Sequence, residues 1–189
     1  LFLHKTPHHV ILLFHLIWLI FFMNIYLQKN TRINATQWIK ENISQGSSLG
    51  VEHWDDPLPL TEGYKYKFLE LPMYEPDNSL EKWRIVNNVL DQADYIILSS
   101  NRLYKPLQKL DDCDKYLRCY PLTSQYYKDL FSGKIGFELV KEFRVCPGLD
   151  WMGIGLRICD DEADESFSVY DHPRVLIFKK GDMVGQGQD

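Results

Sequence analysis

The chain has 189 residues and a formal net charge of −5, and aromatic residues make up 14% of it. The acidic balance and the lack of a basic cluster exclude nucleic acid as a partner. The high aromatic content is typical of a folded domain and not of a disordered chain. About 30 N-terminal residues belong to an apolar segment, so the remainder has the length of one ordinary domain.

Residues 10–27, VILLFHLIWLIFFMNIYL, form one long apolar stretch without formal charge. A helix of this length reaches about 27 Å, close to the thickness of the hydrocarbon core of a bilayer. A signal peptide has a shorter apolar core and a small-residue cleavage site, and a helix of a soluble core usually keeps a polar face. We therefore predict a transmembrane helix, in which His15 and Asn24 face another helix because polar side chains are rarely left against lipid.

The charges beside this segment give its orientation only a weak bias. Lys5 precedes it, whereas Lys29 and Arg32 follow it, which favours a cytoplasmic C-terminus. The chain begins at Leu1 and not at Met, and the simplest interpretation is a fragment of a longer protein. The membrane segment is assigned to residues 1–30 and the folded domain to residues 31–180.

The first helix of the domain is predicted to begin shortly after the apolar segment. Asn34, with Gln37 three residues later, has the spacing of a capping box, and Gly46 is placed to end the helix. So short a connection predicts that the domain packs close to the membrane.

The middle of the chain alternates strands and helices. Strands are predicted at residues 48–52 and 67–71, and Asn78 with Glu81 forms a second capping box that opens a helix. Residues 94–100 contain four consecutive apolar residues, which is typical of a strand buried on both faces of a parallel sheet.

The C-terminal third is predicted to end in a β-hairpin. A short helix near residue 104, a helix from Thr123 to Phe131 and a strand at 137–145 come first. Two short strands, 167–170 and 174–179, are then joined by a tight turn and should pair as a hairpin. These elements predict an α/β sandwich with a mixed sheet, followed by a disordered tail at residues 181–189.

Two groups of residues are candidates for contact with a ligand or acceptor. His53, Asp55 and Asp56 follow a predicted strand, where open α/β sheets often place their sites, and their side chains suit acid–base chemistry. A hydrogen-bonded loop is the simpler alternative. Asp171 and His172 stand at the tip of the predicted hairpin, where an Asx-type turn is the alternative.

The four cysteines contain no C-x-x-C pair, so a zinc site is not expected, and no other metal site is predicted. Cys113 and Cys119 are the pair that a disulfide would close most easily. Free, partly buried thiols remain the alternative for all four. The sequence also lacks a phosphate loop, a nucleophile elbow and a dinucleotide fingerprint, and no cofactor is predicted.

Five ordered segments together carry a resemblance to a known family. They are ATQWIKENI at 35–43, EHWDD at 52–56, ADYIILSSNR at 93–102, YYxxLFSG at 126–133 and DESFSVYDHPRV at 164–175. In this order they resemble the C-terminal end of multi-spanning bacterial glycosyltransferases of the GT-C class, which use a lipid-phosphate sugar donor. The class includes protein O-mannosyltransferase-like and aminoarabinose-transferase-like enzymes.

The resemblance implies that this chain carries the last transmembrane helix and a cap domain on the extracytoplasmic side, against the weak charge bias. In the class, the catalytic carboxylate lies in the first extracytoplasmic loop, far upstream, so no residue of this chain is expected to be catalytic. The implied partners are the bilayer and, through the upstream helices, a polyprenyl-phosphate-linked sugar. The alternatives are a single-pass protein whose domain binds a ligand or partner, and a tethered hydrolase using His53 with Asp55 or Asp56.

Overall fold

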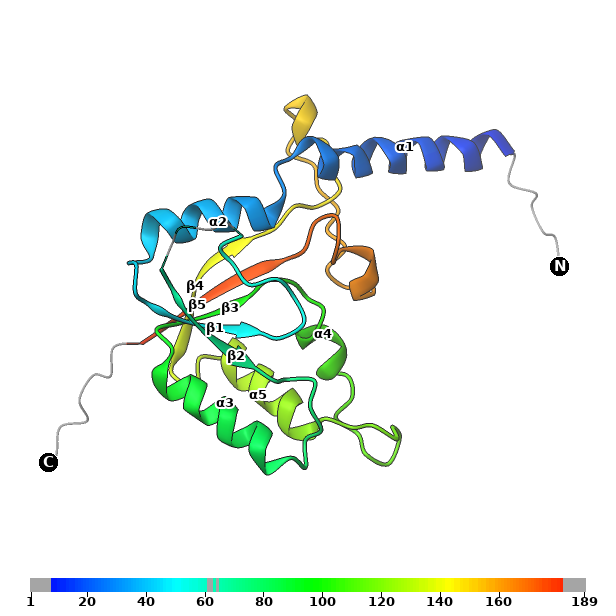
Figure 1. Cartoon of the computed structure of the whole chain (residues 1–189). Coiled ribbons are helices and arrows are strands. Elements are labelled where there is room, and N and C mark those ends of the chain that lie inside the picture. The colour runs from blue at the N-terminus through cyan, green and yellow to red at the C-terminus, as the bar shows by residue number, and fades with distance from the viewer. Residues whose placement is uncertain (1–7, 61–62, 64, 182–189) are drawn as a thin grey trace, which may run out of the picture.

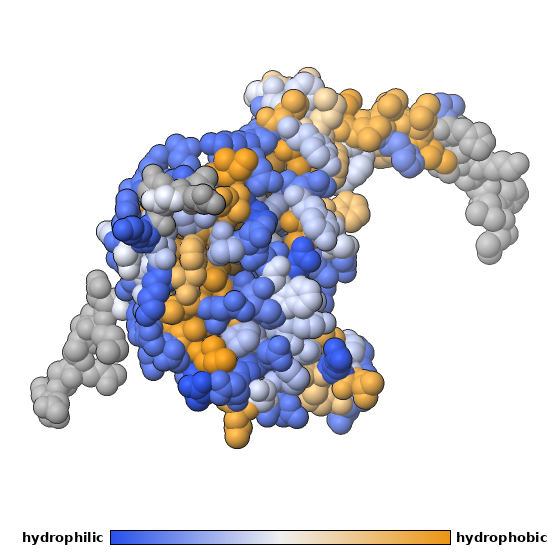
Figure 2. Space-filling model, in the orientation of Figure 1, coloured by the Kyte–Doolittle hydropathy of each residue, from blue (hydrophilic) through white to orange (hydrophobic). Residues whose placement is uncertain are grey.

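The computed structural model describes residues 8–60, 63 and 65–181. Helix α1 (His8–Leu27) projects from the side of a folded domain, and helix α2 (Thr31–Asn42) follows it after three residues (Figure 1). By length and composition, α1 suits a membrane span. Apolar side chains cover its projecting part in Figure 2.

The centre of the domain is a mixed sheet of five strands. They are β1 (Ser48–Glu52), β2 (Lys67–Leu71), β3 (Tyr95–Leu98), β4 (Phe137–Phe143) and β5 (Val175–Lys180). Their order across the sheet is β2-β1-β3-β5-β4. β1 is parallel to both β2 and β3, whereas β5 runs antiparallel to β3 and β4. The predicted α/β fold with a mixed sheet is confirmed.

Helices cover both faces of this sheet and make two separate cores. On one face, α2 packs its buried residues against Leu49, Val51 and Ile97. On the other face lie α3 (Leu80–Gln92), the one-turn α4 (Tyr104–Leu107) and α5 (Pro121–Phe131), packed on Ile96 and Leu98. Successive strand residues point to opposite faces, so a strand between two helical layers must be apolar throughout. The buried run in β3 was predicted for this reason.

Several predicted helix starts are displaced. Asn30, and not Asn34, caps α2: its side chain accepts a hydrogen bond of 2.9 Å from the backbone N–H of Arg32. Ser79 caps α3 in place of Asn78. Neighbouring polar residues offer similar caps, and tertiary packing decides which is used.

The predicted C-terminal hairpin is wrong. The stretch proposed as its first strand contains a short 3-10 helix, η2 (Glu165–Phe167), followed by turns. β5 pairs instead with β3 and β4, because its four consecutive buried residues fit a place inside the sheet. Of the tail predicted to be disordered, only Gly181 is described, hydrogen-bonded to the carbonyl of Gly136; residues 182–189 lie outside the described residues.

All four cysteines form disulfides. Cys113 is bonded to Cys119, the pair expected to close most easily, and Cys146 is bonded to Cys159. The alternative of free thiols is therefore wrong. Two disulfides in one small domain are typical of an oxidising compartment.

Candidate functional site at the carboxyl edge of the sheet

The polar residues of interest gather at one edge of the sheet, which we call the carboxyl edge. It consists of the C-terminal ends of β1 and β3, the end of β4, and the start of the antiparallel β5. In open α/β sheets, ligands bind outside the carboxyl ends of the parallel strands. The loops after β1 and β3, and the loop before β5, meet there.

Asp55 joins two of these loops. Its carboxylate accepts a short hydrogen bond from the hydroxyl of Ser100 and a bond of 3.1 Å from Nε of Arg102. The Arg102 guanidinium also lies over the ring of Tyr170, 5.4 Å from its centroid. Asp55 thus joins the loops after β1 and β3, and Arg102 joins them to the segment before β5.

His53 and Asp56 do not converge on Asp55. Nδ1 of His53 lies 3.2 Å from the carbonyl of Leu71, in the neighbouring strand β2. The side chain of Asp56 is exposed, and its backbone carbonyl accepts a bond of 2.6 Å from Arg32. The three residues therefore form a hydrogen-bonded loop, and they do not make an acid–base set.

A pocket of about 370 Å³ opens beside this cluster. Its lining mixes cationic and anionic side chains from α4, from the end of β4 and from the loop before β5. Within it, Arg144 pairs with Asp161, and Lys105 donates to the backbone carbonyls of Asp161 and Ala163. The arrangement of donors and acceptors suits a polar ligand bearing hydroxyl groups.

His172 is the predicted site residue that lines this pocket. It is 4% exposed, and its Nε2 lies 3.0 Å from a carboxylate oxygen of Asp160. Among the residues that the structure describes, its Nδ1 has no hydrogen-bond partner, and neither has the side-chain oxygen of Asn101, another buried lining residue. Asp171 has an exposed side chain, and its backbone carbonyl accepts a bond from Asn30.

Sequence reasoning missed a buried carboxyl group at the same edge. Glu52, the last residue of β1, is 5% exposed and accepts a hydrogen bond from the hydroxyl of Tyr127. Burial raises the pKa of Glu52 to about 8, although this hydrogen bond opposes the shift. The carboxyl group is therefore protonated at neutral pH. Its position in an otherwise apolar strand was the signal that could have identified it.

The carboxyl edge is also where the domain joins α1. The hydroxyl of Thr31 donates a bond of 2.5 Å to the carbonyl of Pro173, and the ring of Phe22 contacts the ring of His172 edge-on at 6.2 Å. The edge of the sheet that carries the pocket is therefore the edge that faces α1.

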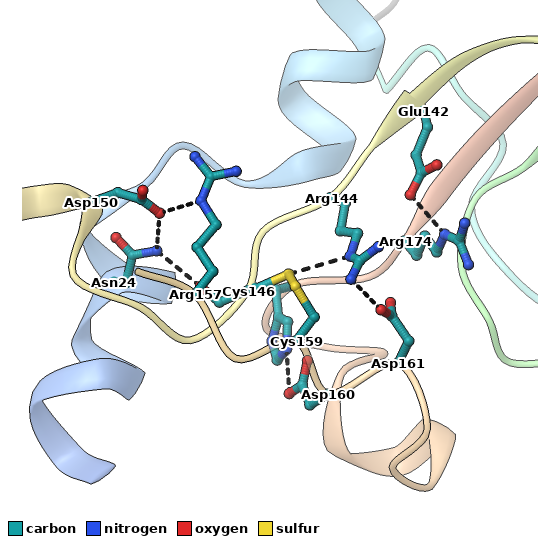
Figure 3. The surroundings of a disulfide bond; sticks show 11 residues. Asn24, Glu142, Arg144, Cys146, Asp150, Arg157, Cys159, Asp160, Asp161 and Arg174 are labelled. Carbon is teal, nitrogen blue, oxygen red and sulfur yellow. Dashed lines mark hydrogen bonds and ion pairs between the residues drawn. A yellow bond between two sulfur atoms is a disulfide. The ribbon is translucent and has the colours of Figure 1, made fainter. Parts of the chain in front are cut away.

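Asn24 was predicted to face another helix, but in the structure it contacts a loop of the domain. Its amide nitrogen donates to the carbonyl of Cys146 at 2.9 Å and to the carboxylate of Asp150 at 3.2 Å (Figure 3). It is 1% exposed, because the loop closed by the Cys146–Cys159 disulfide covers it. His15, by contrast, is exposed, with Nδ1 2.7 Å from the carbonyl of Ile11 one turn earlier.

Within the described residues, no group of three His, Cys, Asp or Glu side chains could hold a metal ion. No family model matches the chain, and none of the curated proteins or solved structures matches it. The site is therefore interpreted from its own geometry.

Proposed function

We propose that this chain is the last transmembrane helix and the extracytoplasmic cap domain of an integral-membrane glycosyltransferase. In this proposal, the enzyme takes its sugar from a polyprenyl-phosphate carrier, and the cap forms part of the entrance for the acceptor. The catalytic carboxylate belongs to a part of the enzyme upstream of residue 1.

The observation that carries the proposal is the meeting of three resembling segments at the carboxyl edge. Asp55 from 52–56, Ser100 and Arg102 from 93–102, and Tyr170 from 164–175 are in one cluster. This edge faces the end of α1 through the contact between the rings of Phe22 and His172. A cap that covers a site in the membrane needs its polar cluster on that side.

The two disulfides support the extracytoplasmic side for the domain, since such bonds persist in oxidising compartments. The pocket beside His172 gives the cap a place for the polar part of an acceptor or donor. Mixed lining charges favour hydroxyl-rich ligands over a strongly charged one, because Arg144 and Lys105 already have partners.

The second candidate function is a single-pass protein whose extracytoplasmic domain binds a ligand by itself. The pocket favours this alternative, because it is formed entirely by residues of this chain. The tethered hydrolase has no such support: Asp55 is held by Ser100 and Arg102, and the Asp56 side chain is exposed.

Reading the gene upstream of the codon for Leu1 distinguishes the two. An open reading frame that continues through several further apolar segments supports the glycosyltransferase. A start codon just before Leu1 would contradict it and favour the single-pass protein.

Reporter fusions test the side of the membrane. Alkaline phosphatase fused after Asp189 should be active, because that enzyme folds only outside the cytoplasm, and a green fluorescent protein fusion should be dark. The reverse pattern would refute the extracytoplasmic location of the domain and, with it, its proposed role as a cap.

A further inference from the structure

The loop closed by the Cys146–Cys159 disulfide has an unusual distribution of side chains. Five large apolar residues between its cysteines are between 41% and 53% exposed: Trp151, Met152, Ile154, Leu156 and Ile158. Its charged residues Asp150 and Arg157 pair with each other at 2.7 Å, and Asp150 also binds Asn24 (Figure 3). The apolar side chains point outward together with Arg157, whose side chain is 62% exposed, while the acidic group points toward α1. So many exposed apolar side chains are unusual in a soluble loop.

The backbone of this loop is largely satisfied from within. Between residues 148 and 158, seven backbone N–H groups donate to carbonyls of the loop or of α1: those of Gly148, Leu149, Met152, Gly153, Ile154, Leu156 and Ile158. An unpaired N–H group is costly in an apolar medium, so a segment that enters one must pair its own backbone. Exposed loops in water have no such requirement.

The contact with α1 fixes the position of the loop along the helix. The N–H of Gly148 donates a bond of 2.8 Å to the carbonyl of Phe21, which lies six residues before the end of α1. At 1.5 Å per residue this is about 9 Å from the end of the helix. In Figure 1 the segment around residue 150 lies beside the end of α1.

We propose that the disulfide-closed loop 146–159 inserts its apolar side chains into the boundary between headgroups and acyl chains of the bilayer. Interfacial segments bury their apolar face about 5–10 Å deep. If α1 ends at the membrane surface and runs along the membrane normal, the roughly 9 Å above is a depth within this range. Trp151 is of a type enriched at this boundary. The proposal rests on α1 spanning the membrane, which is part of the proposed function, but it does not depend on sugar transfer.

Lipid is the partner that we assign to the exposed apolar side chains of the loop, because the loop packs against α1. Phe21 and Asn24, the residues of α1 that hydrogen-bond to the loop, are buried, whereas the apolar side chains from Ile11 to Ile20 are exposed. If α1 lies in a bilayer, the side chains at the level of Phe21 meet the same medium. The loop then gives the domain a second attachment to the membrane.

Tryptophan quenching in the full chain, reconstituted into nanodiscs, tests the loop and the span separately. Emission is compared between the parent and the variants Trp151→Phe, Trp18→Phe and Trp83→Phe, so that each difference isolates one indole. The quenchers are brominated acyl chains in the lipid and iodide in the water. Trp83, in α3 on the far face of the sheet, is the control that should not respond to brominated lipid.

We expect brominated lipid to reduce the Trp151 signal about twofold and iodide to leave it nearly unchanged, as for Trp18. Quenching of Trp151 by iodide but not by lipid, with Trp18 still quenched by lipid, would overturn the insertion and leave the span standing. Insensitivity of Trp151 to both quenchers would also overturn it, because protein would then cover the loop. Failure of Trp18 to respond to lipid would instead refute the span and the proposed function. Should Trp151→Phe not fold, Met152→Trp in the parent gives the same readout.

Discussion

At the scale of single residues, Glu52 dominates the expected response to pH. Burial raises the pKa of Glu52 from its ordinary 4.5 to about 8. Between these two values the folded protein holds a proton that the unfolded chain has released. The contribution of Glu52 to stability is therefore full below pH 4.5 and is lost as the pH rises through 8.

Replacing Glu52 by Gln removes the ionisation and keeps an acceptor for the Tyr127 hydroxyl. Between pH 5 and pH 8 we expect the parent to lose about 3 kcal/mol of its free energy of unfolding relative to Glu52→Gln. One pKa unit corresponds to about 1.4 kcal/mol. Chemical denaturation across this range measures the difference. Glu70→Gln, at an exposed position of neighbouring β2, should match the parent at every pH. Equal pH profiles for Glu52→Gln and the parent would refute the raised pKa.

Gly148 is placed where a side chain would not fit. A Cβ atom there would lie 2.8 Å from the backbone carbonyl oxygen of Leu156, so the two strands of the loop would have to separate. We expect Gly148→Ala to destabilise the loop by about 2 kcal/mol and to increase hydrogen exchange in residues 146–159. Gly155→Ala is the matched control, because a Cβ there meets no atom of the described residues within 4 Å. Similar exchange in both variants would contradict the close approach.

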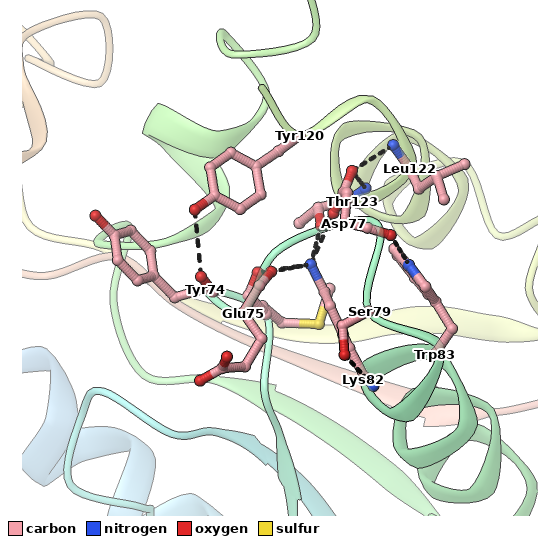
Figure 4. A network of polar contacts seen from close by, with 10 residues as sticks. Tyr74, Glu75, Asp77, Ser79, Lys82, Trp83, Tyr120, Leu122 and Thr123 are labelled. Atoms are coloured by element: carbon pink, nitrogen blue, oxygen red, sulfur yellow. Dashed lines mark hydrogen bonds and ion pairs between the residues drawn. The ribbon is translucent and has the colours of Figure 1, made fainter. Parts of the chain in front are cut away.

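At the scale of elements, α5 obtains its N-terminal cap from a distant turn. The residue before the helix makes no side-chain cap bond. Instead the carboxylate of Asp77 accepts bonds of 2.7 Å and 3.1 Å from the backbone N–H groups of Leu122 and Thr123 (Figure 4). The same carboxylate pairs at 2.7 Å with Lys82, which is 2% exposed and also binds two backbone carbonyls. One buried ion pair therefore joins α3, α5 and the turn between β2 and α3.

We expect Asp77→Ala to destabilise the domain by about 3 kcal/mol, because it leaves the ammonium group of Lys82 buried without its counter-charge. Urea unfolding measures this. Asp111→Ala removes the exposed partner of Lys128, a residue of α5, and should lower the free energy of unfolding by less than about 1 kcal/mol.

Burial raises the pKa of Asp77, but the hydrogen bonds from Lys82 and Thr123 lower this pKa by a larger amount, so the net shift is downward. The stability that Asp77 provides should therefore be lost as the pH falls through this lowered pKa.

The sequence was sufficient for elements whose signal is local. The apolar run of β3 predicted a strand covered on both faces, and it is central in the sheet. The displaced caps and the missed pairing of β5 depend on contacts between distant segments. β5 pairs with β3, about 80 residues earlier, and no local pattern distinguishes this pairing from a hairpin with residues 167–170.

The candidate site was predictable only as a region. The position of His53, Asp55 and Asp56 after a strand placed them at the carboxyl edge of the sheet, but the partners of Asp55 came from a loop that the sequence could not bring together with them. Ser100 is 45 residues from Asp55, and Cys146 is 122 residues from Asn24. Asn24 was recognised as needing a partner, but the partner belongs to the folded domain.

At the scale of the whole molecule, the proposed function predicts a protein that cannot catalyse transfer alone. We expect the 189-residue chain, purified in detergent or nanodiscs, to give no turnover with a radiolabelled polyprenyl-phosphate sugar, because the proposal assigns the catalytic carboxylate to a part of the enzyme upstream of this chain. Thin-layer separation of lipid and products measures this. Release of the sugar above the rate in empty nanodiscs would contradict the proposal that catalysis requires the upstream part of the enzyme.

The burial of Asn24 fixes the rotation of α1 about its own axis relative to the domain. Since Phe21, Asn24 and Ile25 are held by the domain, α1 cannot turn about its axis independently of the sheet. Each residue of an α-helix advances the side-chain direction by about 100°. One alanine inserted between Ile20 and Phe21 would keep the docking contacts but rotate the outer part of α1 by that angle. In an assembled enzyme we expect this insertion to abolish transfer while Ile20→Ala does not. The folded domain would thus determine which face of the membrane helix its neighbours meet.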